Sequence, residues 1–236
     1  MNTYIIAEAA CTWLEGGLDE AKRSISEAAR CGASAWKTQW CSDSVLMHQR
    51  RGILGNHYSR LAWPKEWHEG LKDACNARGI DYLCTVFLPS DVSTVSQYAA
   101  KGKVAAFEYK STDLIEAWMN TGKEVIQSLN AGVVYDPKPS VKYLYCVSNY
   151  PTKYSDAQLW NIPQGYSGYS DHTTNIISGA IAVALGAKII EKHVRLDGCK
   201  ANDPDYGHSL VLDSDNPLYS FKKYVDNIKE AEELIG

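Results

Sequence analysis

Short apolar runs, many of them rich in β-branched residues, recur along the chain and predict strands. They cover residues 4–7, 33–36, 81–86, 104–109, 124–128, 143–147, 165–170 and 188–193. Most are separated by segments with the period of an amphipathic helix, at residues 18–30, 65–77, 92–100, 114–120, 173–185 and 221–235. This alternation predicts an α/β fold with a parallel sheet. Eight strands in 236 residues predict closure into one single-domain (β/α)8 (TIM) barrel over residues 1–236.

Two stretches depart from the regular repeat. Residues 129–141, with one glycine and two prolines, are too short and broken for a full helix, which predicts a reduced fifth helix. Residues 40–64 are too long for an ordinary loop, so we expect an excursion that partly covers the barrel mouth. The alternative is a disordered surface loop. The side chains that could contact a ligand from this segment are His48, Arg50, Arg51, His57 and Tyr58.

Composition excludes several classes of function. Lys and Arg number 24 against 28 Asp and Glu, and no basic run could follow a phosphate backbone, so nucleic acid is not an expected partner. No apolar stretch approaches the roughly 20 residues that span a bilayer, and nothing before Tyr4 resembles a signal peptide. We therefore expect a soluble cytoplasmic protein without a membrane partner. The seven Cys include no CxxC pair and are expected to be reduced, structural thiols.

Polar side chains follow every predicted strand. In a barrel of this kind the functional groups lie at the carboxyl ends of the strands, where a ring of hydrogen-bonding groups suits a small polar ligand. The lysines and hydroxyls among them indicate an anion such as phosphate or carboxylate. Lys192 is expected on a solvated face, because alternation directs it away from His193. The strand-end residues are Glu8, Lys37, Gln39, Thr85, Glu108, Lys110, Ser111, Asp113, Ser128, Asn130, Ser148, Asn149, Tyr150, Ser170, Asp171, His172, Glu191 and His193.

Two of these residues, His172 and His193, predict a metal site. Each closes a short apolar run, and the segment between them has helical periodicity. A strand–helix–strand crossover makes its two strands parallel, so both imidazoles are expected at the same edge of the sheet. Either histidine alone could simply end its strand. Together they can share a divalent cation.

Eight short segments, taken in order, carry a family resemblance. They are Ile6-Ala7-Glu8, Lys37-Thr38-Gln39, Thr85 with Phe87, Thr121-Gly122-Lys123, residues 146–151, Gly168-Tyr169-Ser170-Asp171-His172-Thr173, residues 182–187 and Glu191-Lys192-His193. Together they resemble the barrel domain of the sialic acid synthase (N-acetylneuraminate synthase) family. The segments that contain His172 and His193 are the most specific.

The resemblance implies an activity. Members of this family condense phosphoenolpyruvate with an N-acylated hexosamine, such as N-acetylmannosamine, to a nonulosonic (sialic) acid and phosphate. They use a divalent metal, Mn²⁺ or Mg²⁺, which can polarise the sugar aldehyde as a Lewis acid. The family commonly forms homodimers, for which Trp13, Trp40, Trp63 and Trp67 are candidate contact residues, although buried packing is the alternative.

The resemblance also implies residue roles. His172 and His193 would bind the metal, and Glu8, Lys37 and His193 would be catalytic, with Glu8 as the acid/base. Lys37, Thr85, Ser111, Ser128 and Ser170 would hold phosphoenolpyruvate. Gln39, Asp113, Tyr150 and Asp205 would face the sugar. We add Ser148 and Lys110 to the substrate-binding set from their place at strand ends.

Several positions depart from the family pattern. Near the end of the fourth strand Glu108 stands where we expect the family's Lys, and Lys110, on the same face of an extended strand, is expected to restore the charge. Residues 11–14 replace an Asn-His pair. The sequence ends at Gly236, before the family's antifreeze-like domain, so we expect the barrel alone. Two other functions stay open: a non-catalytic sugar- or metal-binding relative, and another metal-dependent barrel lyase or aldolase.

Overall fold

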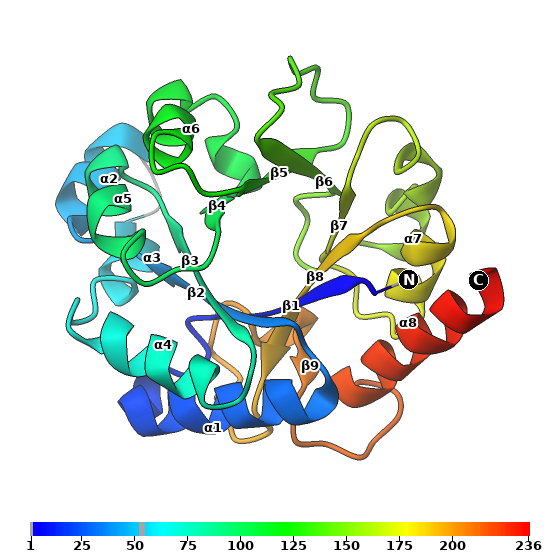
Figure 1. Ribbon diagram of the computed structural model, residues 1–236. Coiled ribbons are helices and arrows are strands. Elements are labelled where there is room, and N and C mark those ends of the chain that lie inside the picture. The colour runs from blue at the N-terminus through cyan, green and yellow to red at the C-terminus, as the bar shows by residue number, and fades with distance from the viewer. Residues whose placement is uncertain (1, 52–54) are drawn as a thin grey trace.

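Eight parallel strands close into a barrel in the computed structural model, which describes residues 2–51 and 55–236 (Figure 1). Each strand pairs with the next, and β8 pairs back with β1. The strands are β1 (Tyr4–Ala10), β2 (Ala35–Trp40), β3 (Asp81–Val86), β4 (Gly102–Val104), β5 (Val125–Asn130), β6 (Val141–Cys146), β7 (Gly168–Asp171) and β8 (Ile189–Arg195). A short β9 (Leu210–Val211) adds to β8 outside the barrel. The predicted TIM barrel is confirmed.

Helices surround the barrel (Figure 1). They are α1 (Gly17–Cys31), α2 (Ser44–Arg51), α3 (Gly55–Arg60), α4 (Trp67–Asn76), α5 (Pro89–Val95), α6 (Thr112–Met119), α7 (Ser178–Ala184) and α8 (Phe221–Ile235). In α1 the apolar residues at helical spacing, Ala21, Ile25 and Ala28, are buried in the main apolar core. Residues 131–140, between β5 and β6, contain no helix, which confirms the reduced fifth helix. Among the residues that the structure describes, no helix is long and apolar enough to cross a membrane.

Short 3-10 turns complete the connections. They are η1 (Leu14–Gly16), η2 (Ala106–Glu108), η3 (Tyr154–Asp156), η4 (Leu159–Asn161) and η5 (Tyr206–His208). The predicted fourth strand, residues 104–109, is wrong, because β4 ends at Val104 and η2 follows. Backbone hydrogen bonds from Glu108 N to Ala105 O and from Ser111 N to Glu108 O, both 2.9 Å, wind this segment into turns. Glu108 and Lys110 therefore do not share the face of an extended strand.

Residues 40–64 are folded rather than disordered over their described part. They contribute α2 and α3, and Met47, Tyr58 and Leu61 pack in a separate apolar cluster with Phe87 and Leu88. This packing holds the segment against the β3–α5 connection. The side chains of Arg51 and His57, which were expected to contact a ligand, lie outside the described residues.

The structure shows that the tryptophans, cysteines and the lysine whose exposure the sequence left open are largely buried. Trp13, Trp40 and Trp63 are buried and Trp67 is half-buried against the same core, so they form no exposed contact surface. All seven cysteines are free and buried. Lys192 does point away from the barrel interior, but the expectation of a solvated side chain is wrong. Its ammonium is buried 3.2 Å from Asp171 Oδ2, because α7 and α8 cover this face and Tyr224 also binds that carboxylate.

Candidate functional site

An apolar layer inside the barrel sets where the polar side chains lie. Six strands contribute to it, through Ile6, Ala35, Leu83, Ile126, Leu144 and Ile189. Side chains two residues apart on a strand share a face, so the next inward positions are one layer nearer the carboxyl ends. Glu8, Lys37, Thr85, Ser128 and Glu191 occupy these positions. The alternation that builds the barrel floor therefore also builds a polar ring above it.

A cavity of about 480 Å³ opens above the floor at the carboxyl ends of the strands. Ten of the predicted site residues line it: Glu8, Lys37, Gln39, Thr85, Ser128, Tyr150, Ser170, His172, His193 and Asp205. Tyr58 and Glu191, which the sequence had placed in the 40–64 excursion and at a strand end, line it as well. The lining residues that were not predicted include Phe87, Lys103, Phe107, Pro204 and His208. The cavity thus combines buried charges with aromatic walls, as ligand sites commonly do.

Lys37 lies at the centre of one half of the polar ring. Its Nζ is 3.0 Å from Glu8 Oε2 and 3.4 Å from Glu191 Oε2, and it donates a 2.9 Å hydrogen bond to Thr85 Oγ1. Gln39 Nε2 donates to Glu8 Oε1 at 2.9 Å. Register explains this proximity, because Glu8 on β1 is directly opposite Lys37 on β2. The ammonium and both carboxylates are buried, so each charge depends on the others.

Lys103 lies at the centre of the other half. Its Nζ donates to Ser128 Oγ at 2.9 Å and lies 3.5 Å from Glu191 Oε1, which also accepts from Ser170 Oγ at 2.8 Å. Lys103 is opposite Thr85 in the register of β3 and β4. The cavity therefore holds two buried ammonium groups and three hydroxyls, the donors that an anion requires.

Burial and charge shift the pKa values in opposite directions across this ring. Burial raises the pKa of Glu191, but Lys103 and Lys37 outweigh burial and hold that pKa well below its usual range. Burial lowers the pKa of Lys37, but Glu191 and Glu8 outweigh it and raise that pKa overall. For Lys103 burial is the larger effect, so its pKa is lowered despite Glu191. Lys103 is the ammonium that an incoming anion would stabilise most.

The predicted histidine pair converges on the same cavity. The ring centroids of His172 and His193 lie 5.5 Å apart. His172 Nδ1 lies 2.8 Å from the carbonyl oxygen of Val147. Because a carbonyl oxygen can only accept, Nδ1 carries the proton and Nε2 of the neutral ring keeps a lone pair that can bind a metal. Burial and the neighbouring His193 lower the pKa of His172 to about 3, so the ring is neutral at physiological pH. Tyr150 packs on His172 with 4.2 Å between ring centroids.

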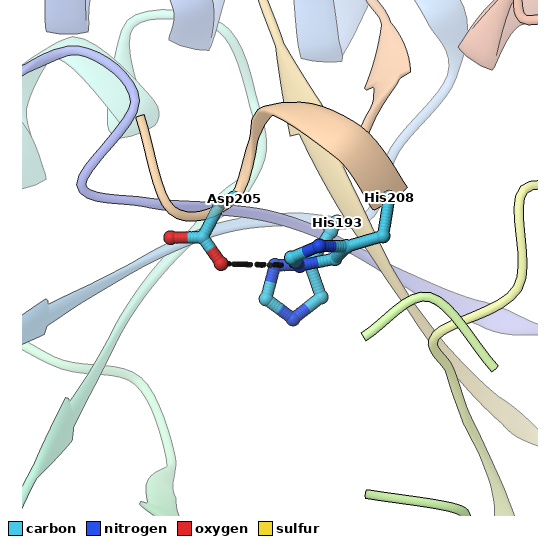
Figure 2. Close-up of side chains that lie close together, drawn as sticks. All are labelled: His193, Asp205 and His208. Carbon is cyan, nitrogen blue, oxygen red and sulfur yellow. Dashed lines mark hydrogen bonds and ion pairs between the residues drawn. The ribbon is translucent and has the colours of Figure 1, made fainter. Parts of the chain in front are cut away.

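A third imidazole, His208, lies beside this pair. Asp205 Oδ1 lies 3.2 Å from His193 Nδ1 and 3.1 Å from His208 Nε2 (Figure 2). Burial raises the pKa of Asp205, but its contacts with both histidines outweigh burial and lower that pKa overall. The carboxylate is therefore ionised between two imidazoles.

The residues present fit a divalent cation. Two imidazoles that share a cation about 2.1 Å from each ring nitrogen have ring centroids about 5 Å apart, close to the spacing of His172 and His193. His193 Nδ1 is buried and makes no aligned hydrogen bond, as expected of a nitrogen that binds a metal ion. Neutral imidazoles with one carboxylate are ordinary ligands for transition-metal ions.

Four predicted substrate-binding residues lie outside the cavity. Lys110, Ser111 and Asp113 line a separate hollow, because the chain turns away at η2. There Ser111 Oγ donates to Glu108 Oε2 at 2.5 Å, and Asp113 Oδ2 accepts from Arg50 at 3.3 Å. Ser148 lies on the β6–η3 connection, where its backbone N–H donates to Asn130 Oδ1 at 2.9 Å.

Two residues of the site, Lys103 and His208, were not predicted from the sequence, and only Lys103 could have been. Lys103 could have been found by starting the fourth strand two residues earlier, at Gly102, because Val104 packs in the outer apolar core and its neighbour Lys103 then faces inward. His208 carries no periodic signal, because it lies in a 3-10 turn that returns to β8 only in the folded chain.

Comparison with known proteins shows which family this chain resembles. The NeuB family profile matches residues 24–236. An uncharacterized protein of Methanocaldococcus jannaschii is 33% identical over 99% of this chain and 72% of its own length. The pseudaminic acid synthase of Campylobacter jejuni is 28% identical over the whole chain and 75% of its own length.

Solved structures share the fold of this chain. A sialic acid synthetase from Leptospira borgpetersenii, crystallised with citrate, superposes with a TM-score of 0.86 at 26% identity, over the whole chain and 86% of that protein. A truncated 3-deoxy-D-arabino-heptulosonate 7-phosphate synthase from Thermotoga maritima, at 15% identity and a TM-score of 0.71 over 99% of this chain and 88% of its own, shares the fold. The family profile extends over most of the barrel, and the chain belongs to the NeuB family.

Proposed function

We propose that this protein condenses phosphoenolpyruvate with an N-acylated hexosamine, similar to N-acetylmannosamine, to give a nonulosonic acid and phosphate. The observation that carries the proposal is the presence, in one cavity, of two buried lysines beside a pair of convergent imidazoles. Relatives named pseudaminic acid synthase and N,N'-diacetyllegionaminic acid synthase support a reaction of this class.

Phosphoenolpyruvate would bind to the polar ring. Lys37 and Lys103 would each hold an anionic oxygen, and the hydroxyls of Thr85, Ser128 and Ser170 would donate to the remaining oxygens. These groups are already fixed by hydrogen bonds, so little reorganisation is required when charge develops on the departing phosphate. Glu108, whose carboxylate would have repelled a phosphate, lies outside the cavity lining.

Glu8 is suited to move a proton. Its Oε2 is buried without an aligned hydrogen bond, and it lies opposite His193 in the register of β1 and β8. Glu8 Oε2 would accept a proton from the water that attacks the pyruvyl carbon, and Lys37 and Gln39 would hold the carboxylate in place.

The sugar would bind nearer the mouth, against Gln39 and Tyr150. His172 and His193 would hold a divalent cation, which when bound polarises the sugar aldehyde as a Lewis acid. The aromatic walls formed by Tyr58, Phe87 and Tyr150 would exclude bulk water from the cavity and leave room for the one water that reacts. The homodimer expected from the resemblance and the cytoplasmic location expected from the composition stay predictions.

The test is direct. The protein is incubated with Mn²⁺, phosphoenolpyruvate and a panel of N-acylated hexosamines, and phosphate release and 2-keto acid formation are measured together. We expect equal amounts of both products with at least one sugar, and none with His172→Ala, whose circular dichroism should match the wild type. Phosphate release without a 2-keto sugar acid, or no turnover with any sugar, would overturn the proposal.

A further inference from the structure

The loop after β8 brings a third imidazole to the cation site. Asp205 immediately precedes η5 and His208 is its last residue, and residues three apart in a 3-10 helix lie on one side. The chain then enters β9, which pairs with Val194 and Arg195 directly after His193. Ser209 Oγ donates to the carbonyl oxygen of Asp205 at 2.6 Å and closes the turn. His193 and His208 are thus held together by the same strand pair.

The spacing of the three side chains matches a coordination site. A cation about 2.1 Å from each ligand places neighbouring ligand atoms about 3.0–3.4 Å apart. Asp205 Oδ1 is 3.2 Å from His193 Nδ1 and 3.1 Å from His208 Nε2, and the two ring centroids are 4.5 Å apart. All three side chains are buried and line the cavity, and they point toward one another (Figure 2).

The surroundings of Asp205, His193 and His208 favour binding of a cation by these side chains. His193 Nδ1 is buried and makes no aligned hydrogen bond, although Asp205 Oδ1 lies 3.2 Å away. Tyr150 packs against all three imidazoles, with ring centroids 4.2 Å from His172, 5.8 Å from His193 and 5.0 Å from His208. An aromatic wall over nitrogen ligands keeps competing water away from the metal.

We propose that His208 and Asp205 are direct ligands of the cation that His172 and His193 hold, so that this chain presents three imidazoles and one carboxylate. This inference builds on the proposed cation site but does not require the proposed reaction. It also assigns Asp205 to the cation rather than to the sugar. The cation is then a transition-metal ion such as Mn²⁺ or Co²⁺, because Mg²⁺ prefers oxygen ligands and binds nitrogen-rich sites weakly.

The first experiment measures cation affinity without substrates. The metal-free protein is titrated calorimetrically with MnCl₂, CoCl₂ and MgCl₂, as wild type, His208→Ala and His208→Gln. We expect both variants to lose at least about tenfold in affinity for Mn²⁺ and Co²⁺ and less than about threefold for Mg²⁺. Wild type that binds Mg²⁺ as tightly as Mn²⁺ and Co²⁺ would overturn the inference.

The second experiment tests whether His208 binds the metal itself or only orients another ligand. A residue that only orients a ligand can also cost tenfold or more in metal affinity, so affinity alone is insufficient. Pulsed electron paramagnetic resonance of bound Mn²⁺ counts coordinated nitrogens, and we expect one fewer in both His208 variants. His208→Gln keeps an N–H donor for Asp205 and so tests ligation. An unchanged nitrogen count would overturn the inference and leave His208 as a positioning residue.

Two controls complete the design. Tyr206→Phe alters the same 3-10 turn on the side that packs against Arg195, and should leave affinity and nitrogen count unchanged. His172→Ala should lose one nitrogen. Because no substrate is present, a protein that binds Mn²⁺ through three imidazoles but forms no product would contradict only the proposed reaction.

Discussion

At the scale of single residues, the anion site depends on which lysine enters the cavity. Lys110 is exposed beside Tyr109, whereas Lys103 is buried and bonded to Ser128. The difference arises from backbone conformation, because β4 ends after three residues and η2 redirects the chain. β4 begins two residues before the predicted strand and ends five residues before the end of that strand, and this shift exchanges the roles of the two lysines.

The first prediction compares these two lysines. Lys103→Ala should weaken phosphoenolpyruvate binding at least about tenfold, since a hydrogen bond to a charged group contributes about 1.5–3 kcal/mol. Lys110→Ala, the matched control, should change it less than twofold because its ammonium lies outside the cavity. Calorimetric titration with phosphoenolpyruvate measures both. A larger loss in Lys110→Ala would restore the role predicted from sequence.

At the scale of elements, the segment that carries α2 and α3 forms one wall of the cavity. Tyr58 lines the cavity and packs edge-on against Phe87 with 5.2 Å between ring centroids. Arg60 Nη2 lies 2.7 Å from Asp203 Oδ2 and links α3 to the loop that carries Asp205. This segment therefore contributes an aromatic wall and an anchor.

The second prediction tests that wall. Tyr58→Ala should raise the KM for the sugar about tenfold, because removing the ring opens the cavity to water. Arg50→Ala should change it less than twofold, since Arg50 pairs with Asp113 at the surface, 3.3 Å away. Steady-state kinetics with varied sugar concentration measure both variants. If Arg50→Ala has the larger effect, the segment acts through its charged donors instead.

The third prediction concerns the pairing of β7 with its neighbours. A Cβ added at Gly168 would fall within the van der Waals radii of the Ile189 carbonyl oxygen and the Leu144 side chain. Gly168→Ala should therefore lower the free energy of unfolding by about 1–3 kcal/mol, the usual cost of overpacking. Gly198→Ala is the control, because nothing lies within 4 Å of its added Cβ. Urea denaturation measures both, and equal stabilities would contradict the close approach of the strands.

At the scale of the whole molecule, buried ionisable groups link stability to pH. His68 is fully buried among aromatic rings, with Nδ1 2.8 Å from the hydroxyl of Tyr82. Burial lowers the pKa of His68 to about 4. A group whose folded pKa is lowered takes up its proton preferentially in the unfolded chain, so its contribution to stability is present above pH 6.5 and is lost as pH falls toward 4.

The fourth prediction follows from that sign. Between pH 7 and pH 4.5 the wild type should lose about 2 kcal/mol of unfolding free energy through His68 alone. His68→Gln, which does not titrate, should be less stable at pH 7, and the difference from wild type should narrow by that amount at pH 4.5. Urea unfolding at both pH values measures this. A constant difference would show that His68 titrates normally.

The barrel and much of its site follow from sequence alone. Alternation of two residues in strands determines which side chains face inward, so the positions of Glu8, Lys37 and Ser128 could be predicted from the apolar residues two positions before them. The crossover between His172 and His193 is likewise local, because a strand, a helix and a strand in succession are brought together by their own geometry.

Tertiary structure decided what depends on contacts between segments far apart in the chain. His208 reaches His193 only because β9 pairs with β8, and Lys192 is buried only because α7 and α8 cover Asp171. Lys103 enters the cavity because β4 ends early. Sequence periodicity predicts which face of a helix or strand is apolar. It does not predict the path of an irregular segment or which element packs over a charged side chain. Packing between distant elements settles both.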